Sequence, residues 1–125
     1  MKAWRIENDD GIDALNLADI DIGEPGPGEV RFRVKASSLN RRDYNTVRAP
    51  GERNTPMPRI PNSDAAGEVV AVGEGVSEFK PGDRVASCFF KRWQGGRMRA
   101  PIMASALGGA EEGMLSDETI LPETG

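Results

Sequence analysis

Hydrophobic and polar residues alternate most regularly in the segment 30–37. The even positions carry Val, Phe, Val and Ala, and the odd positions carry Arg, Arg, Lys and Ser. A repeat of two residues is typical of a β-strand that turns one face to the core and the other to water. The segment therefore predicts an antiparallel strand with one wet face.

The segment 59–85 is the most informative part of the chain. Small residues at 64–67 lead into the apolar run Val69–Val72, and glycines at 73 and 75 interrupt it. Pro81 can preset φ for a turn, and Gly82 can supply a positive φ at the next position. The pattern predicts a strand, a loop, a tight turn and a second strand. We expect the strands around Val69 and Val85 to form the centre of a compact β domain.

The remaining segments predict short elements around this centre. Strands are expected at Lys2–Ile6 and from Leu15 to about Ile22, paired as a hairpin. Ser38 or Asn40 can cap a short helix that runs to about Val47, with Asp43 in its first turn. Towards the end of the chain the patterns predict a strand continuing over 86–90, a helical turn within 102–107 and a last strand over 114–121.

The composition agrees with a turn-rich β domain and argues against nucleic acid and membranes as partners. The 125 residues include 15 Gly and 9 Pro, and 38% are hydrophobic, which favours one β domain over a helical bundle. The net charge of −4 gives no attraction to nucleic acid or anionic membranes, and no apolar run is long enough to cross a bilayer. Trp93 lies among four basic residues at 91–99 and could stack on a base, but a surface loop is the favoured interpretation.

The chain contains no histidine and only one cysteine, Cys88. Hydrolysis by a Ser-His-Asp or Cys-His arrangement is thereby excluded within these residues, as is a zinc site that includes histidine. A single cysteine forms no intrachain disulfide and suits the cytoplasm. We expect Cys88 to be a small core residue.

Gly73-Glu74-Gly75 is similar to the start of a dinucleotide-binding fingerprint, but the third glycine would fall at Glu78 and no helical pattern follows. That fingerprint needs a helix whose N-terminus meets the pyrophosphate. The two glycines are therefore predicted to belong to a turn.

Several spaced motifs resemble one family. Pro61–Val69, Val72–Val76 and Gly82–Val85 follow its order, preceded by Leu39–Asp43 and followed by the glycine-rich segment 108–115. Together they resemble the N-terminal, GroES-like catalytic domain of the medium-chain dehydrogenase/reductase superfamily. The resemblance covers nearly the whole chain. It implies one domain over residues 1–125, all-β with short helices, folded as a partly open GroES-like barrel.

Many members of this superfamily are zinc alcohol dehydrogenases, but their two catalytic-zinc ligands do not match. Asn40 stands where they have a cysteine, and Asn62-Ser63-Asp64 stands where they have Gly-His-Glu. The resemblance is thus to the zinc-independent branch, which includes quinone oxidoreductases and enoyl reductases. It implies no zinc, NADP or NAD as cofactor, and a small substrate: a quinone, an enone, or an alcohol or aldehyde.

The same resemblance names the candidate site residues. Asn40 and Asp43 are expected to face the nicotinamide as catalytic and cofactor-contacting groups, with Tyr44 near them as a third catalytic candidate. Asp43 could instead serve only as an acid in the first turn of a helix, and Tyr44 as an ordinary aromatic. Asp64 is expected to be a buried structural carboxylate rather than a catalytic one.

Superfamily members continue into a Rossmann cofactor domain, whose fingerprint is not found in these 125 residues. The resemblance therefore implies that this chain alone transfers no hydride. It also implies self-association, because an incomplete domain would leave a strand edge or apolar patch open. A stand-alone GroES-like module with a binding or scaffold role is the alternative, since fold does not imply function.

Overall fold

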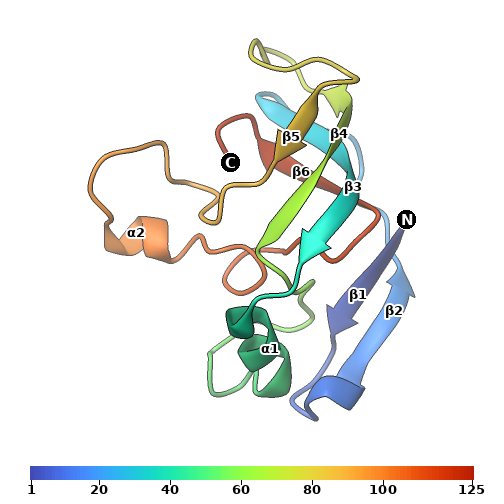
Figure 1. Cartoon of the computed structure of the whole chain (residues 1–125), viewed down its shortest axis with the longest axis vertical. Helices are drawn as coiled ribbons and strands as arrows, with labels where there is room; N and C mark the ends of the chain where they lie inside the picture. Colours follow the sequence, from blue (N-terminus) through green and yellow to red (C-terminus); the bar gives the residue numbers. More distant parts are fainter.

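The computed structural model describes all 125 residues and consists mainly of strands (Figure 1). Two short helices and one 3-10 turn accompany six strands. They are β1 (Lys2–Ile6), the 3-10 turn (Ile12–Ala14), β2 (Leu15–Asp19), β3 (Glu29–Ser38), α1 (Arg41–Arg48), β4 (Asp64–Val72), β5 (Arg84–Ala86), α2 (Ala100–Met103) and β6 (Glu118–Pro122). The predicted all-β class with short helices is confirmed.

The strands form two antiparallel sheets. The larger has the order β5-β4-β3-β6, and β1 pairs with β2 in a separate two-stranded ribbon. Isolated bridges from Ala3 to Ser116 and from Ile6 to Arg59 connect the ribbon to the rest of the domain. Neither sheet closes on itself, so the domain is the expected partly open β structure. Figure 1 shows the larger sheet above, with the ribbon and α1 at the lower end.

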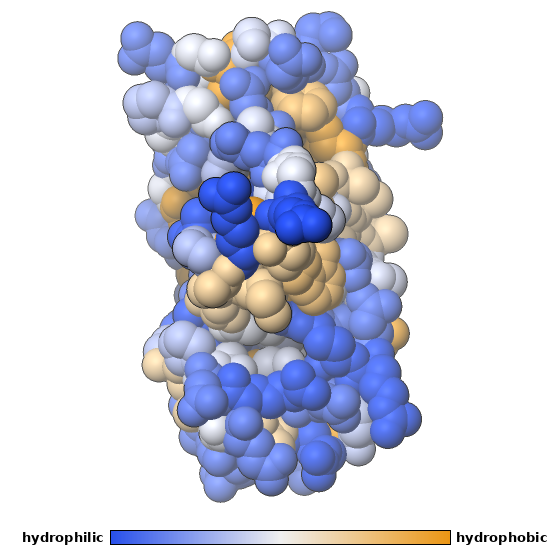
Figure 2. Space-filling model, turned by 90° about the vertical axis from the view of Figure 1, so that its left-hand side faces the viewer, coloured by the Kyte–Doolittle hydropathy of each residue, from blue (hydrophilic) through white to orange (hydrophobic).

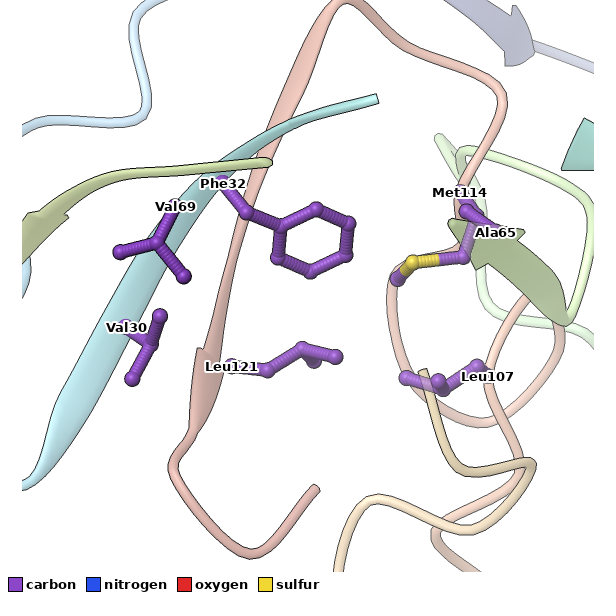
Figure 3. Packing of buried hydrophobic residues seen from close by; sticks show 7 residues of the cluster. All are labelled: Val30, Phe32, Ala65, Val69, Leu107, Met114 and Leu121. Carbon is purple, nitrogen blue, oxygen red and sulfur yellow. The ribbon is translucent and has the colours of Figure 1, made fainter. Parts of the chain in front are cut away.

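The core lies against β3 and β4, the two long central strands. Phe32 is paired with Val69 across these strands, and both side chains are buried, as the alternation predicted. Burial of such a side chain stabilises the fold by about 1.5–3 kcal/mol. Figure 3 shows the complete cluster: Val30, Phe32, Ala65, Val69, Leu107, Met114 and Leu121. Gly67 allows the strands to approach closely, because a Cβ there would lie 2.0 Å from the Arg33 carbonyl oxygen.

Several expected boundaries were wrong in detail. The centre of the sheet is β3 with β4, whereas the strand of Val85 is a three-residue edge strand. The chain leaves the sheet after Ala86, so Cys88 is exposed rather than in the core. The helical turn expected within residues 102–107 is α2, which begins slightly earlier, at Ala100.

The last strand begins later than expected, at Glu118. The Met114 amide donates to the carbonyls of Pro61 and Asn62, so residues 113–115 pair with the 60–62 segment instead of with β3. β2 ends at Asp19, three residues before the predicted end. The glycines at 73 and 75 lie in the turn after β4, as predicted.

None of the helices is both long and apolar enough to cross a membrane.

Candidate functional site

The candidate residues lie where β3 ends and α1 begins. Asn40 is the N-cap residue, with extended backbone angles of φ −95° and ψ 156°. Its backbone N–H donates to Asp43 Oδ2 at 2.9 Å, and the Asp43 N–H donates to the Asn40 carbonyl at 3.0 Å. An acid three residues after the cap closes a capping box, which explains why the helix starts here. Of the two caps that the sequence allowed, Asn40 is the one used.

The carboxylate of Asp43 is enclosed. The residue is 2% exposed, and its second oxygen accepts a hydrogen bond from Arg42 Nη1 at 3.2 Å. Both oxygens therefore already have partners inside the protein. This geometry favours the helix-cap role of Asp43 over direct contact with a ligand.

Two polar side chains donate hydrogen bonds to one carboxylate oxygen beside the cap. Asp64 Oδ2 accepts hydrogen bonds from Asn40 Nδ2 and from Ser63 Oγ, the latter at 2.8 Å. Ser63 is fully buried, whereas Asp64 is only half-buried, which corrects the expectation of a buried carboxylate. Hydrogen bonds to an ionised acceptor are the strong ones, so this cluster ties the start of α1 to the start of β4.

Two of these positions, Asn40 and Ser63, are those at which the resemblance would place zinc ligands. Zinc needs lone pairs from three or four sulfur, nitrogen or carboxylate ligands. Here the Asn40 amide and the Ser63 hydroxyl direct hydrogens at Asp64 instead. Nowhere in the chain do three or more His, Cys, Asp or Glu side chains gather closely enough to hold a metal ion. The residues present do not fit a zinc site.

A mostly apolar groove of about 410 Å³ runs along the first turns of α1. Asn40, Asp43 and Tyr44 all contribute to its wall, so the structure brings the three sequence candidates together. Tyr44 and Leu39 lie at the rim, 52% and 81% exposed. The full lining is Ile12, Leu15, Leu39, Asn40, Arg41, Asp43, Tyr44, Val47, Asn62 and Leu115.

Sequence reasoning missed the opposite wall of this groove. Ile12 and Leu15 come from the turn of the ribbon and Leu115 from the segment before β6, and no sequence pattern joins them to residue 40. Asn62, which also lines the groove, is the one of these residues whose type hinted at a special backbone position, because asparagine is one of the few residues that tolerate a positive φ. Its φ is 70°, and its buried amide donates to Ser37 Oγ at 3.0 Å.

The 125 residues hold no cradle for a dinucleotide pyrophosphate. Such a site needs a glycine-rich turn that runs into a helix N-terminus. α1 begins after Leu39 and Asn40, and α2 has only four residues and begins after Arg99.

Comparisons with known proteins agree with this fold. The family model for the alcohol dehydrogenase GroES-like domain matches residues 26–125. A zinc-type alcohol dehydrogenase-like protein of Schizosaccharomyces pombe is 34% identical over 113 residues, which are 90% of this chain and 33% of the relative. The chloroplastic quinone-oxidoreductase QR1 of Triphysaria versicolor is 39% identical over 79 residues, 62% of this chain and 24% of the relative.

Solved structures give the same result over nearly the whole chain. A Sinorhizobium meliloti 1021 protein assigned as an alcohol dehydrogenase superposes with a TM-score of 0.84 at 36% identity, covering 98% of this chain and 37% of its own. An NAD-dependent alcohol dehydrogenase does so with a TM-score of 0.78 at 32% identity, covering 98% and 38%. The chain thus spans less than half the length of each of these relatives. It belongs to the alcohol dehydrogenase GroES-like domain family, the N-terminal domain of the medium-chain dehydrogenase/reductase superfamily.

Proposed function

We propose that this domain forms the substrate-side wall of the active site in a zinc-independent, NAD(P)(H)-dependent oxidoreductase that reduces quinones or enones. The observation that carries the proposal is the groove beside α1, where Asn40, Asp43 and Tyr44 line one mostly apolar space. The alcohol dehydrogenase and quinone oxidoreductase relatives support the reaction class.

The hydrogen bonds around Asp64 favour a quinone or enone over an alcohol. Alcohol oxidation at a zinc site depends on a metal that polarises the hydroxyl oxygen. In this chain Asn40 and Ser63 are committed as donors to Asp64 and offer no ligand set. A quinone or enone is already activated by its own conjugated carbonyl, and an apolar groove with a few polar groups suits a flat ring.

Each candidate residue has a distinct proposed role. Bound NAD(P)H would supply the hydride. Asn40 uses one amide hydrogen for Asp64, so its second hydrogen is left to donate to a substrate carbonyl oxygen in the groove. The Tyr44 hydroxyl makes no hydrogen bond within the chain. It is proposed to donate a second hydrogen bond to the substrate carbonyl oxygen or to supply a proton to the substrate. Asp43 positions Asn40 by accepting its backbone N–H.

We also propose that the domain transfers hydride only together with a cofactor-binding domain. Holding the nicotinamide next to the substrate supplies much of the rate in such reactions. The 125 residues provide no pyrophosphate cradle, so affinity for the dinucleotide should be weak.

Two measurements test the proposal. NMR titration of labelled protein with 1,4-naphthoquinone or 2-cyclohexenone should shift the signals of Asn40 and Tyr44. Loss of reduced-cofactor absorbance should occur when NADPH or NADH, the enone or quinone, and a separately produced Rossmann domain of a relative are all present. The rate should then fall about 10- to 100-fold in an Asn40→Ala variant, because one hydrogen-bond donor to the charge that develops on the substrate oxygen is lost. Asn45→Ala, on the same helix but outside the groove, is the matched control.

The alternative function, a stand-alone binding or scaffold module, predicts different results. Quinone and enone would then leave the Asn40 and Tyr44 signals unchanged, and no added Rossmann domain would produce turnover. Turnover that disappears on chelation and returns with zinc would contradict the zinc-independent mechanism.

A further inference from the structure

The segment 88–107, here called the arm, leaves the sheet after β5 and returns before β6 (Figure 1). Its base is closed by backbone hydrogen bonds from Lys91 to Ser105, 2.9 Å, and from Leu107 to Phe89, 3.0 Å. Beyond that base, every residue from 92 to 101 is exposed. The arm is therefore a loop that is anchored at its base and exposed to solvent at its tip.

The exposed side chains of the arm have the composition of a protein–protein interface. Trp93, Met98 and Met103 are 42%, 38% and 61% exposed. Interfaces are enriched in Trp, Met and Arg and depleted in acids, and Trp and Arg dominate their binding energy. No acidic residue occurs between Asp83 and Glu111. Figure 2, which views the side that carries the arm, shows strongly hydrophilic side chains directly beside hydrophobic ones.

Two of the four basic residues of the arm have no acidic partner. Lys91 and Arg92 both reach Glu111, at 3.7 and 2.9 Å. Arg97 and Arg99 form no ion pair. An exposed tip with two uncompensated guanidinium groups around apolar side chains fits an acidic protein surface with an apolar centre.

The chain itself offers such a surface at the turn of the β1–β2 ribbon. The turn, residues 7–14, contains four acidic residues and no basic one. Within the turn, Asp10 and Asp13 form no ion pair, and Ile12 between them is 50% exposed. The turn is therefore acidic around an apolar side chain, and its charge is opposite to that of the arm.

One molecule cannot make this contact with itself, because the arm projects to the left of the domain whereas the ribbon turn lies at its lower end (Figure 1). We propose that the arm of one copy docks on the ribbon turn of a second copy, with Arg97 and Arg99 against Asp10 and Asp13. The two surfaces are different, so the contact is heterologous and closes into a ring or extends as a chain. This assigns a specific surface to self-association and does not depend on the proposed catalytic function.

Sedimentation equilibrium at two salt concentrations provides the first test. At about 0.05 M salt, mass should rise with protein concentration, and at about 0.5 M salt association should weaken at least about tenfold, because exposed charges are then screened. Trp93→Ala should weaken association at both concentrations. A chain that stays monomeric at low salt and millimolar concentration overturns the proposal.

Charge reversal at both surfaces tests which residues meet. Arg97→Glu with Arg99→Glu, and separately Asp10→Lys with Asp13→Lys, should each abolish self-association. An equimolar mixture of the two variants should associate again, because each reversed surface then meets a complementary one. The mixing experiment also separates docking from misfolding, since misfolded variants would not recover. Failure of the mixture to associate overturns the proposal.

The control variant carries Arg53→Glu and Arg84→Glu, exposed positions outside the arm without ion pairs, and changes net charge by the same amount. It should associate like the wild type. Loss of association equal to that of the arm variant would show a general charge effect and overturn the assignment. Binding of the arm to a single-stranded oligonucleotide, with no self-association, would do the same.

Discussion

Replacing Asp64 by alanine should destabilise the domain, because Asp64 Oδ2 is the shared acceptor of two side chains. Ser63 is fully buried, so its hydroxyl would lose its acceptor in a place that water does not reach. An unsatisfied buried donor costs about 1–3 kcal/mol. The Asn40 amide lies at the groove and can turn to water, so losing its hydrogen bond should lower the free energy of unfolding by about 1 kcal/mol or less.

The expected total is about 1–4 kcal/mol at pH 7, a large part of the roughly 5–15 kcal/mol by which domains are stable. Urea unfolding followed by circular dichroism and tryptophan fluorescence measures it. Asp64→Asn keeps one oxygen as acceptor and should lose about 1 kcal/mol. Glu52→Ala, which removes an exposed acid without an ion pair, is the control and should change stability by less than about 0.5 kcal/mol.

Double-mutant cycles separate the two hydrogen bonds. The coupling free energy between Asp64 and Ser63 should exceed that between Asp64 and Asn40, because only Ser63 is shielded from water. An Asp64→Ala variant within about 0.5 kcal/mol of the wild type would refute the reasoning, since the carboxylate would then not hold the two elements together. A stronger coupling to Asn40 would show that the groove side of the cluster is the less hydrated one.

Three other results are expected. Burial opposes ionisation of Glu118, but hydrogen bonds from Arg31 and Arg33 outweigh it and hold the pKa of Glu118 below its ordinary value of 4.5. Glu118→Gln should therefore cost about 1 kcal/mol at pH 7, and the difference from the wild type should shrink as the pH falls below about 4.5, measured by urea unfolding across pH. A constant difference down to pH 3 would contradict this. Gly113→Ala should lose about 3 kcal/mol or more by thermal unfolding, because a Cβ there would lie 2.2–2.5 Å from three carbonyl oxygens. Gly75→Ala, in open space at φ 80°, should lose only about 1–2 kcal/mol, and equal losses would refute the close approach at Gly113. Protein that has been washed with chelator, incubated with zinc and dialysed should retain no zinc when its metal content is measured. Stoichiometric zinc would show an unrecognised set of ligands.

The sequence pattern predicted the elements that depend on residues close together in the chain. The alternation over 30–37 predicted β3, because a strand between solvent and core leaves a repeat of two residues. A polar cap with an acid in the first turn predicted α1, since a helix start satisfies its free amides with nearby side chains and favours negative charge. The spaced motifs from Pro61 to Val85 were specific enough to indicate the family, which the comparisons confirmed.

Long-range contacts decided what the local patterns left open. β5 is short because the chain turns away into the arm, and β6 starts late because Met114 bonds to the segment 60–62. The far wall of the groove comes from Ile12 and Leu115, which lie 28 and 75 positions from Asn40 and bear no local mark of it.

The sequence by itself determined the residue types available for chemistry: no histidine, one cysteine, and asparagine and serine at the positions where relatives of the zinc branch have ligands. Only the tertiary structure decided what those residues do to one another. It brings Asn40 from the end of β3 and Ser63 from the start of β4 onto one oxygen of Asp64. A hydrogen bond depends on distance and direction in space, and positions 24 residues apart meet only once the two strands have paired.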